Sequence, residues 1–245
     1  MAKVKRLHGR ILVMCEKTPK FEQVFGIVSY SPAQEFSANW KMMTQETLSE
    51  LKKHEKTTTF RVSAKRLTKD FSKTSPEIER ELGALIVEAT GWKVDLEAPE
   101  LDVCLEIIGP SSYLFTKTIK CLGGLPVGAE GKVLVLISQD PKSHLAALLL
   151  AKRGCDIQPV MLESQKTPDV ALLESFLPRQ VTIEKLTGPD QMDIVAEKRF
   201  CTAIIVPDTL GTLQEYDSSY PILRPLIGLS DEEVLVELEK YKRAL

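Results

Sequence analysis

Residues 132–154 constrain the fold of this chain more than any other stretch. Lys132–Ile137 is a short apolar run, typical of a strand buried on both faces. The polar segment Ser138–Ser143 contains a proline and ends that strand, and Leu145–Ala151 then predicts a helix that ends at Gly154. A strand, a tight loop and a helix in this order present backbone N–H groups to a phosphate. The stretch therefore predicts an α/β unit with a candidate phosphate loop.

The same alternation of strand and helix continues to the C-terminus. The pattern predicts strands at 133–137, 157–162, 181–186 and 202–206, and helices at 143–153, 168–176, 190–198 and 231–241. Strands that alternate with helices indicate a parallel sheet with crossover helices. The glycine-rich segment 123–131 precedes this region and is the clearest linker in the chain.

The first half of the chain predicts two small α+β units. The first has strands at 10–15 and 24–30 and a helix at 44–56 with Thr44 as N-cap, which is too little for a complete core. The second has a strand at 57–65, a helix that begins at Ser75 and ends at Gly91, and a hairpin with strands at 103–108 and 113–117.

Charge is separated along the second unit. The whole chain has a net charge of −2, so any surface that attracts nucleic acid must be local. Residues 61–75 hold five basic residues and one acidic residue, a net charge of +4, whereas residues 76–110 have a net charge of −7. We interpret this separation as a binding face with a solvated back.

Other side chains give no sign of metal or membrane chemistry. The five cysteines are far apart and mostly lie in apolar runs, so we expect buried thiols in a reducing cytoplasm. The three histidines show no metal-ligand spacing, and no apolar run approaches the length needed to span a membrane. We therefore predict no metal site and no membrane contact.

Several motifs, taken in order, resemble one protein family, the ThiI-type tRNA sulfurtransferases or tRNA 4-thiouridine synthetases. Val24–Pro32 resembles the end of that family's N-terminal ferredoxin-like domain. Three segments resemble its THUMP domain: Phe60–Arg66, Glu77–Gly83 and Val94–Leu96. Four segments resemble its PP-loop domain: Gly123–Gly128, Gly131–Val133, Leu210–Gly211 and Leu223–Gly228.

The resemblance implies an α+β N-terminal part followed by an α/β parallel-sheet domain of the adenine nucleotide alpha hydrolase type. The expected ranges are a partial ferredoxin-like domain (1–56), a THUMP domain (57–122), a linker (123–131) and a PP-loop domain (132–245). It also implies that tRNA is the partner and that intact members carry out ATP-dependent sulfur transfer. Whether the chain forms a homodimer stays open.

The chain departs from the family at the nucleotide loop. The family pattern is Ser-Gly-Gly-x-Asp-Ser, and the corresponding residues here are Ser138, Gln139, Asp140, Pro141, Lys142 and Ser143. Both serines remain, but both glycines and the aspartate are replaced. The resemblance also implies that the chain begins inside the first domain of the family and ends before the region of its catalytic cysteine, so we expect no catalytic residue within it.

These replacements predict that the loop does not bind ATP. The glycines let the backbone approach a pyrophosphate, and the Cβ atoms of Gln139 and Asp140 would crowd that space. We infer that the Asp140 carboxylate caps the following helix and takes the place of a phosphate. No cofactor is therefore expected. The alternative is that Pro141-Lys142-Ser143 imitates the Gly-Lys-Ser/Thr of a P-loop, with ATP and Mg²⁺ bound.

Basic residues in and after the strand at 57–65 are candidates for RNA contact. Arg61, Ser63 and Lys65 share one strand face, opposite the inward Phe60 and Val62. Together with the resemblance this suggests a grip on tRNA phosphates; a solvated charged loop is the alternative. The RNA-binding candidates are Arg61, Lys65, Arg66, Lys69, Lys73, Lys117 and Lys120.

Three functional hypotheses remain open. The first is a tRNA-binding protein of this family without adenylation, and the second is an active tRNA sulfurtransferase in 4-thiouridine and thiamine thiazole biosynthesis with an atypical loop. The third is a dimer or regulator that binds another small anion in the crevice of the sheet.

Asp208 lies at the end of a predicted strand, where its carboxylate either contacts a ligand or caps the loop. Arg224 is expected to pair with a buried carboxylate, and Cys121, Cys155 and Cys201 to fill the core.

Overall fold

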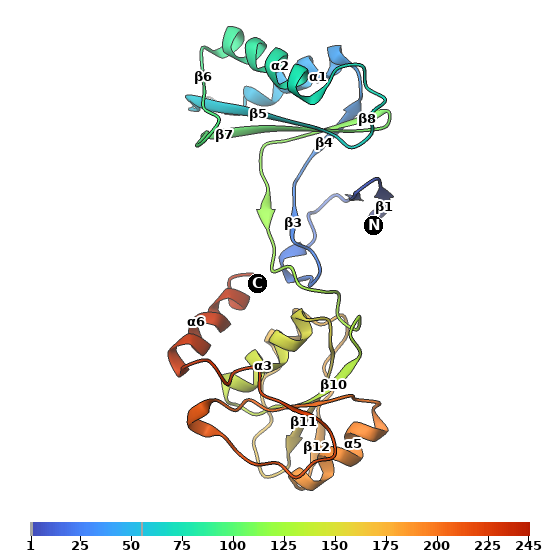
Figure 1. The fold of residues 1–245 in the computed structure, drawn as a ribbon, viewed down its shortest axis with the longest axis vertical. Helices are drawn as coiled ribbons and strands as arrows, with labels where there is room; N and C mark the ends of the chain where they lie inside the picture. The colour runs from blue at the N-terminus through green and yellow to red at the C-terminus, as the bar shows by residue number, and fades with distance from the viewer. Residues whose placement is uncertain (1, 55) are drawn as a thin grey trace. The chain divides into compact units, whose positions relative to one another are not determined.

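The computed structural model describes residues 2–54 and 56–245, which form two compact units. The N-terminal unit comprises the residues up to Pro19 together with Tyr30–Ile119, and the C-terminal unit comprises Lys20–Ser29 and Lys120–Leu245. Each unit has its own sheet and hydrophobic core (Figure 1). The expected order, an α+β part followed by an α/β part, is confirmed.

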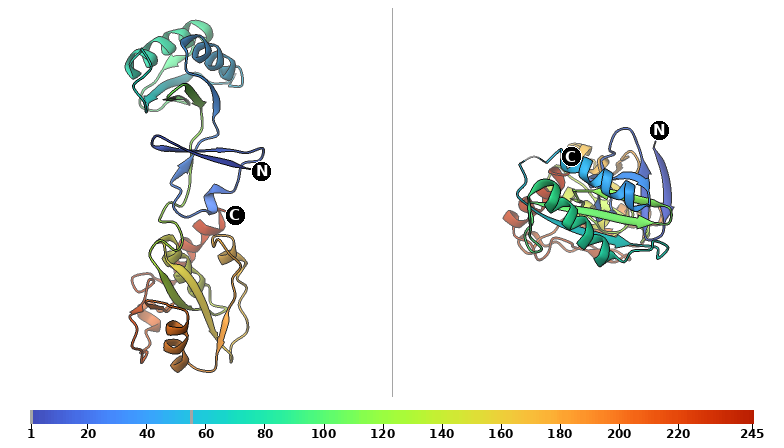
Figure 2. Two further views of the ribbon diagram at one scale, coloured as in Figure 1. Left: turned by 90° about the vertical axis from the view of Figure 1, so that its right-hand side faces the viewer. Right: turned by 90° about the horizontal axis from the view of Figure 1, so that it is seen from above.

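The N-terminal unit is a five-stranded mixed sheet with two helices on one face (Figures 1 and 2). The strands, in sheet order, are β4 (Gln34–Ser37), β8 (Ser111–Phe115), β7 (Leu101–Ile108), β5 (Thr59–Arg66) and β6 (Lys93–Val94). The helices are α1 (Trp40–Leu51) and α2 (Ser75–Thr90). Alternate residues of β5 and β7, including Phe60, Val103 and Leu105, are buried under them.

Helix α2 has clear signals at both ends. The Glu77 carboxylate accepts hydrogen bonds from the backbone N–H of Thr74 at 2.7 Å and from the Thr74 hydroxyl at 2.8 Å. These bonds lower the pKa of Glu77 and identify Thr74, one residue before the predicted Ser75, as the N-cap. Gly91 ends the helix with φ +72°, a conformation that glycine adopts without strain.

The N-cap of helix α1 lies five residues earlier than predicted. Asn39, not Thr44, is its N-cap, and the Asn39 side chain accepts a bond from the Met42 N–H at 2.9 Å. The helix also ends at Leu51 rather than at residue 56. Because the helix starts early, Met43 lies on the same helix face as Leu51, and both residues are buried.

Short paired strands lie outside the two main sheets. β1 (Lys3–Leu7) and β2 (Arg10–Met14) form an antiparallel hairpin, and β3 (Ser29–Tyr30) pairs with β9 (Ile119–Lys120). The predicted strand at 24–30 is extended only at its end, because a turn closes at Gly26 (φ +98°) and Ile27 N–H donates to the Val24 carbonyl. A 3₁₀ turn, η1 (Phe21–Gln23), precedes that turn.

The C-terminal unit is a parallel sheet flanked by helices, as predicted, but it has five strands where four were expected, because β14 was not predicted. The strands, in sheet order, are β12 (Glu184–Leu186), β11 (Asp156–Leu162), β10 (Lys132–Leu136), β13 (Ile204–Ile205) and β14 (Ile222–Leu223). The helices are α3 (Pro141–Lys152), α4 (Ala171–Glu174), α5 (Met192–Lys198) and α6 (Asp231–Lys242), with 3₁₀ turns η2 (Pro189–Gln191) and η3 (Leu210–Thr212). Most of α3 is buried, and α6 packs against it.

The structure groups the chain differently from the predicted ranges 1–56, 57–122 and 123–131. β4 and α1 belong to the sheet and core of β5–β8, because Phe36, Met43 and Leu51 are buried in that core. The glycine-rich segment 123–131 belongs to the C-terminal unit, where Leu125 N–H donates to the Lys152 carbonyl at 2.9 Å.

Gly124 gives a direct test of this docking. Its φ is +86°, and a Cβ atom at this position would lie 2.2 Å from the carbonyl oxygen of Lys152. We expect Gly124→Ala to lower the free energy of unfolding by roughly 2–3 kcal/mol in a urea titration. Gly211→Ala is the control, since a Cβ atom there meets nothing within 4 Å. Equal stability of the two variants would show that segment 123–131 is a loose linker.

Candidate functional site

The loop between β10 and α3 is closed by hydrogen bonds to its own backbone. The Asp140 carboxylate accepts a bond from the Lys142 N–H at 2.9 Å, so the predicted N-cap is confirmed. The Ser143 hydroxyl accepts from the Ser138 N–H at 3.1 Å and lies 2.8 Å from the Asp140 carbonyl. The Ser138 hydroxyl in turn accepts from the Asp140 N–H at 3.1 Å. The two serines and the aspartate thus use their side chains to hold the turn.

Two side chains tie this loop to the rest of the unit. Lys142 Nζ lies 2.7 Å from Asp231 Oδ1 in the first turn of α6, and this bond raises the pKa of Lys142. The Lys142 side chain is only 16% exposed. His144 Nε2 lies 2.8 Å from the Asp169 carbonyl oxygen, which holds the segment before α4 against α3. The ammonium group that could meet a phosphate is already paired with a carboxylate.

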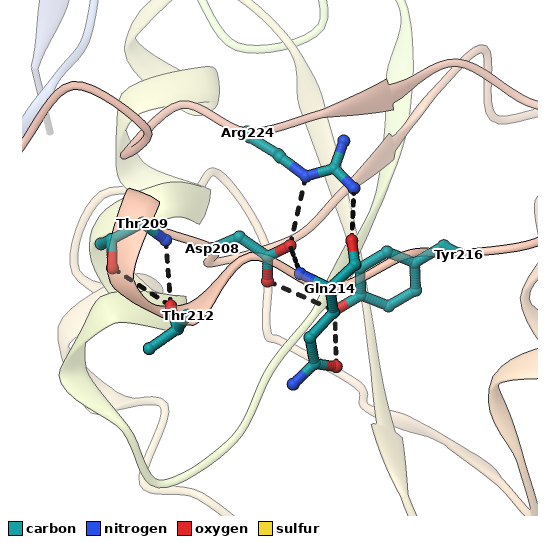
Figure 3. A network of polar contacts seen from close by, with 6 residues as sticks. All are labelled: Asp208, Thr209, Thr212, Gln214, Tyr216 and Arg224. Carbon is teal, nitrogen blue, oxygen red and sulfur yellow. Dashed lines mark hydrogen bonds and ion pairs between the residues drawn. The ribbon is translucent and has the colours of Figure 1, made fainter.

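Asp208 is the centre of a second cluster, which follows strand β13 (Figure 3). The residue is 5% exposed, and its carboxylate accepts bonds from the Gln214 N–H at 3.2 Å, the Tyr216 hydroxyl at 3.3 Å and Arg224 Nε at 3.2 Å. Arg224 Nη2 also donates to the Gln214 carbonyl at 2.8 Å. The expectation that Arg224 pairs with a buried carboxylate is confirmed, and Asp208 also caps the loop that follows it.

The environment of Tyr216 shows how closed this cluster is. Burial, followed by the charge of Asp208 and the hydrogen bond to it, raises the pKa of Tyr216 to about 12. The Arg224 guanidinium lies 5.8 Å from the centre of the Tyr216 ring. A carboxylate surrounded by these donors has a structural role in the loop and is poorly placed to act as a base.

Both clusters lie at the same edge of the parallel sheet. β10 and β13 are hydrogen-bonded neighbours that run in the same direction, and residues 138–143 and Asp208 follow their carboxyl ends. This edge is where open α/β sheets place ligands. Within the described residues no group of histidine, cysteine or acidic side chains is arranged to hold a metal ion.

The predicted RNA-binding residues divide into two groups. Three are engaged within the N-terminal unit: Arg61 pairs with Asp102, Arg66 Nη1 donates to the Phe71 carbonyl at 3.0 Å, and Lys73 pairs with Glu81 at 2.6 Å and lies over Trp40. The other group is exposed and consists of Lys65, Lys69, Lys117 and Lys120. Lys120 belongs to the C-terminal unit, so the structure does not join it to the others.

The cysteines behave as thiols. The five cysteines form no disulfide with one another. Cys155 and Cys201 are buried, as expected, and burial raises the pKa of Cys201 to about 11. Cys121 is half-buried, whereas Cys15 is exposed. None of the helices in the described part of the chain combines the length and the apolar character needed to cross a bilayer.

Comparison with known proteins gives consistent matches. Residues 38–117 match the THUMP domain family. The chain is 32% identical to a probable tRNA sulfurtransferase of Methanocaldococcus jannaschii, over 96% of this chain and 76% of that protein. It is 30% identical to a probable tRNA sulfurtransferase of Thermococcus kodakarensis, over 95% and 75% of the two chains.

Two solved structures have a similar fold. PH1313 from Pyrococcus horikoshii Ot3 matches with a TM-score of 0.84 and 27% identity, over 99% of this chain and 87% of that one. A 4-thiouridine synthetase in complex with RNA and with bound ATP matches with a TM-score of 0.81 and 25% identity, over 100% and 78%.

Removal of Arg224 tests the cluster around Asp208. We expect Arg224→Met to destabilise the protein by roughly 3 kcal/mol, because it leaves a buried carboxylate without its cation. The double variant Asp208→Leu/Arg224→Met should lose less than the sum of the two single variants, by at least about 1 kcal/mol in a double-mutant cycle. Arg243→Met, an exposed change at the end of α6, is the control. Strict additivity would contradict the pairing.

Proposed function

The chain belongs to the tRNA sulfurtransferase family, and we propose that it is a member that binds tRNA but does not adenylate it. In this proposal the N-terminal unit, which carries the THUMP domain, contacts the RNA. The C-terminal unit keeps the parallel sheet of the PP-loop domain as a scaffold or interaction module.

The observation that carries the loss of adenylation is the bond from the Lys142 N–H to the Asp140 carboxylate. The first N–H groups of a helix have no partner within the helix and form the natural binding site for a phosphate. Here a side chain of the protein occupies that position. A triphosphate would have to displace this carboxylate and would also be repelled by its charge.

The P-loop-like alternative requires Lys142 to reach a phosphate. Lys142 is held by Asp231 at 2.7 Å, in the first turn of α6, where two further acids, Glu232 and Glu233, lie. Moving the ammonium group to a phosphate would break this pair and leave Asp231 beside Glu232 and Glu233 without its cation. The loop also lacks a glycine before the lysine, and that glycine allows the backbone to curl around a phosphate.

One observation favours the second candidate, an active tRNA sulfurtransferase with an unusual loop. Ser138 and Ser143 occupy both serine positions of the family pattern, and Ser143 is fully buried beneath the turn. In that case the chain would thiolate tRNA, with sulfur supplied by another protein. Thiolation of tRNA by the purified chain with ATP and a sulfur donor would establish this candidate and reject the first.

Binding of RNA is supported by the THUMP match and by the exposed lysines of the N-terminal unit. Lys65, Lys69 and Lys117 are exposed on that unit, whereas the aromatic side chains Phe60, Phe71 and Trp92 are wholly or partly buried. A surface with exposed amines and buried rings favours contact with phosphates over the stacking of single-stranded bases. We therefore propose that the chain recognises a tRNA by the shape and charge of a duplex region.

Restoration of the loop is the sharpest test of the lost adenylation. Replacing Gln139→Gly, Asp140→Gly and Lys142→Asp together returns the family pattern around Pro141 and removes the capping carboxylate. We expect no binding of ATP–Mg²⁺ to the natural chain in calorimetry, and measurable binding to the triple variant.

The control for this experiment is the single variant Gln139→Gly, which leaves the Asp140 cap in place. It should bind no ATP. Gln139 is exposed, so its replacement by glycine makes room beside the loop but does not free the helix N–H groups. Micromolar binding of ATP to the natural chain would reject the proposal.

Charge reversal on the N-terminal unit tests RNA binding. We expect Lys65→Glu/Lys69→Glu to weaken tRNA binding several-fold and to reduce the slope of log affinity against log salt by about one for each phosphate that is no longer bound. Lys166→Glu/Lys185→Glu makes the same change in charge at exposed positions of the C-terminal unit and should have little effect. Filter binding over a salt series measures both quantities. Equal weakening by the two variants would indicate only a general effect of net charge.

A further inference from the structure

Phe200 ends helix α5 in a conformation that is rare for an aromatic residue. Its φ is +57°, and no other non-glycine residue of the described chain has a positive φ. The N–H groups of Phe200 and Cys201 donate to the carbonyl groups of Glu197 and Ala196, at 3.0 and 2.8 Å, which is a Schellman motif. Glycine is the usual residue at this point of the motif, because a side chain is strained in the left-handed region. Phe200 therefore lies at a position that favours glycine.

Burial does not compensate for this strain. Phe200 is 88% exposed, the largest exposed fraction of any large apolar residue in the described chain. An aromatic ring can bury a large apolar area against a partner, so a ring that stays in water forgoes that stabilisation. A residue that is both strained and exposed is not explained by the stability of the fold, and outliers of this kind cluster at functional sites.

Charged side chains gather next to Phe200 at the amino ends of the strands. Lys132 and Asp156 are the first residues of β10 and β11 and are partners in register. Burial is the main cause of the raised pKa of the neighbouring Cys201 thiol, and the charges of Lys132, Asp156 and Arg199 also act on it. These groups therefore surround the same end of the sheet, which we call the amino edge.

The amino edge has an excess of exposed cations. Four basic side chains pair there with two carboxylates: Lys132 and Arg179 with Asp156, and Lys198 and Arg199 with Glu184. Four cations share two acids, so these six groups have a net charge of +2. The two acidic side chains are 25% and 22% exposed, whereas the four basic side chains are 30–63% exposed. The acids lie deeper, and the surface around Phe200 is cationic.

We propose that the amino edge is a docking surface for an acidic peptide segment of a partner protein, with Phe200 as the anchor for an aromatic side chain of that segment and the four cations as a rim. Protein interfaces are enriched in aromatic and arginine side chains, and a few such residues carry most of the binding free energy. The surface names a partner class for the interaction role proposed for the C-terminal unit.

This surface is separate from the nucleotide loop. Phe200 precedes β13, whereas the loop follows the carboxyl end of β10, and the two strands run in the same direction. The amino edge therefore lies at the other end of the strands. Docking there depends neither on the loss of adenylation nor on the binding of tRNA by the N-terminal unit.

The charges at the amino edge favour a peptide over a nucleic acid. Each cation already shares a carboxylate, so few charges are free to replace the counterions of a phosphate backbone. Surfaces for single-stranded nucleic acid also present several aromatic side chains on which successive bases stack. Phe200 is the one aromatic residue among the large apolar residues exposed in the described chain. A modest excess of positive charge around one ring suits an acidic segment that carries a ring of its own.

The test uses two labelled synthetic polymers as probes, poly-glutamate and a random copolymer of glutamate and tyrosine. We expect the natural chain to bind the copolymer about tenfold more tightly than poly-glutamate in fluorescence anisotropy, because only the copolymer offers rings to Phe200. Phe200→Gly should abolish this preference, and Phe200→Trp should keep it. Phe200→Gly should not lower the free energy of unfolding in urea, since glycine adopts this conformation without strain.

Matched variants control for loss of apolar surface and of charge. Leu213→Gly removes an exposed apolar side chain elsewhere on the C-terminal unit and should leave the preference for the copolymer intact. Lys198→Gln/Arg199→Gln should weaken the binding of both polymers several-fold. Lys166→Gln/Lys240→Gln makes the same change in net charge at other exposed positions and should not.

Four results would overturn the proposal. Equal affinity of the natural chain for the two polymers, or an unchanged preference in Phe200→Gly, would show that Phe200 is not an anchor. A loss of stability in Phe200→Gly would give the residue a structural role. Tighter binding of poly-uridine than of the copolymer, lost in Phe200→Gly, would identify a nucleic-acid surface. Because neither ATP nor tRNA is used, each of these results leaves the proposed loss of adenylation and the proposed tRNA binding untouched.

Discussion

The free N–H groups at the start of α3 can be bonded by one anion, and the structure supplies that anion from within the chain. The Asp140 carboxylate bonds the Lys142 N–H, and Pro141 has no N–H to offer. A helix start of this kind, after a buried parallel strand, is the position at which a nucleotide phosphate is commonly held. The carboxylate satisfies one of the donors that a phosphate would use, so this helix start has a partner from the chain itself.

Neighbouring contacts follow the same principle. Lys142 pairs with Asp231, and Asp208 pairs with Arg224 and Tyr216. Each of these charged groups at the carboxyl edge of the sheet has a partner of the protein itself. An edge of this kind stabilises the C-terminal unit, and under the proposed function it gives a physical reason for the sheet to persist without adenylation. The RNA-contacting features proposed for the N-terminal unit do not depend on this edge.

Local signals are enough to predict much of the fold. The strand–loop–helix unit, the parallel sheet, the Asp140 cap and the limits of α2 to within one residue all follow from short-range patterns of apolar, capping and glycine residues. The start of α1 cannot be decided in this way, because both Asn39 and Thr44 are good N-cap residues. Burial of Met43 selects Asn39, and that burial depends on a core formed by strands distant in the sequence.

The charged sites show the same limit. The strand pattern places Arg61 on an outward face as a candidate for RNA contact, yet Arg61 pairs with Asp102, which is 41 residues away and becomes its neighbour only when β5 and β7 align. The grouping of α1 with the THUMP sheet also depends on contacts that the sequence does not display. Sequence patterns can therefore identify a basic strand face, but the strand register decides which of its charges remain available.

The central claim, that the Asp140 carboxylate occupies the place of a phosphate, is tested most directly by amide NMR of the natural chain. The measurement is the position of the Asp140, Lys142 and Ser143 N–H resonances as ATP–Mg²⁺ is added, with Asp140→Gly as the comparison. The account predicts that these three resonances stay unchanged in the natural chain at millimolar ATP and move in the variant. Saturable shifts of the same resonances in the natural chain at micromolar ATP would contradict it.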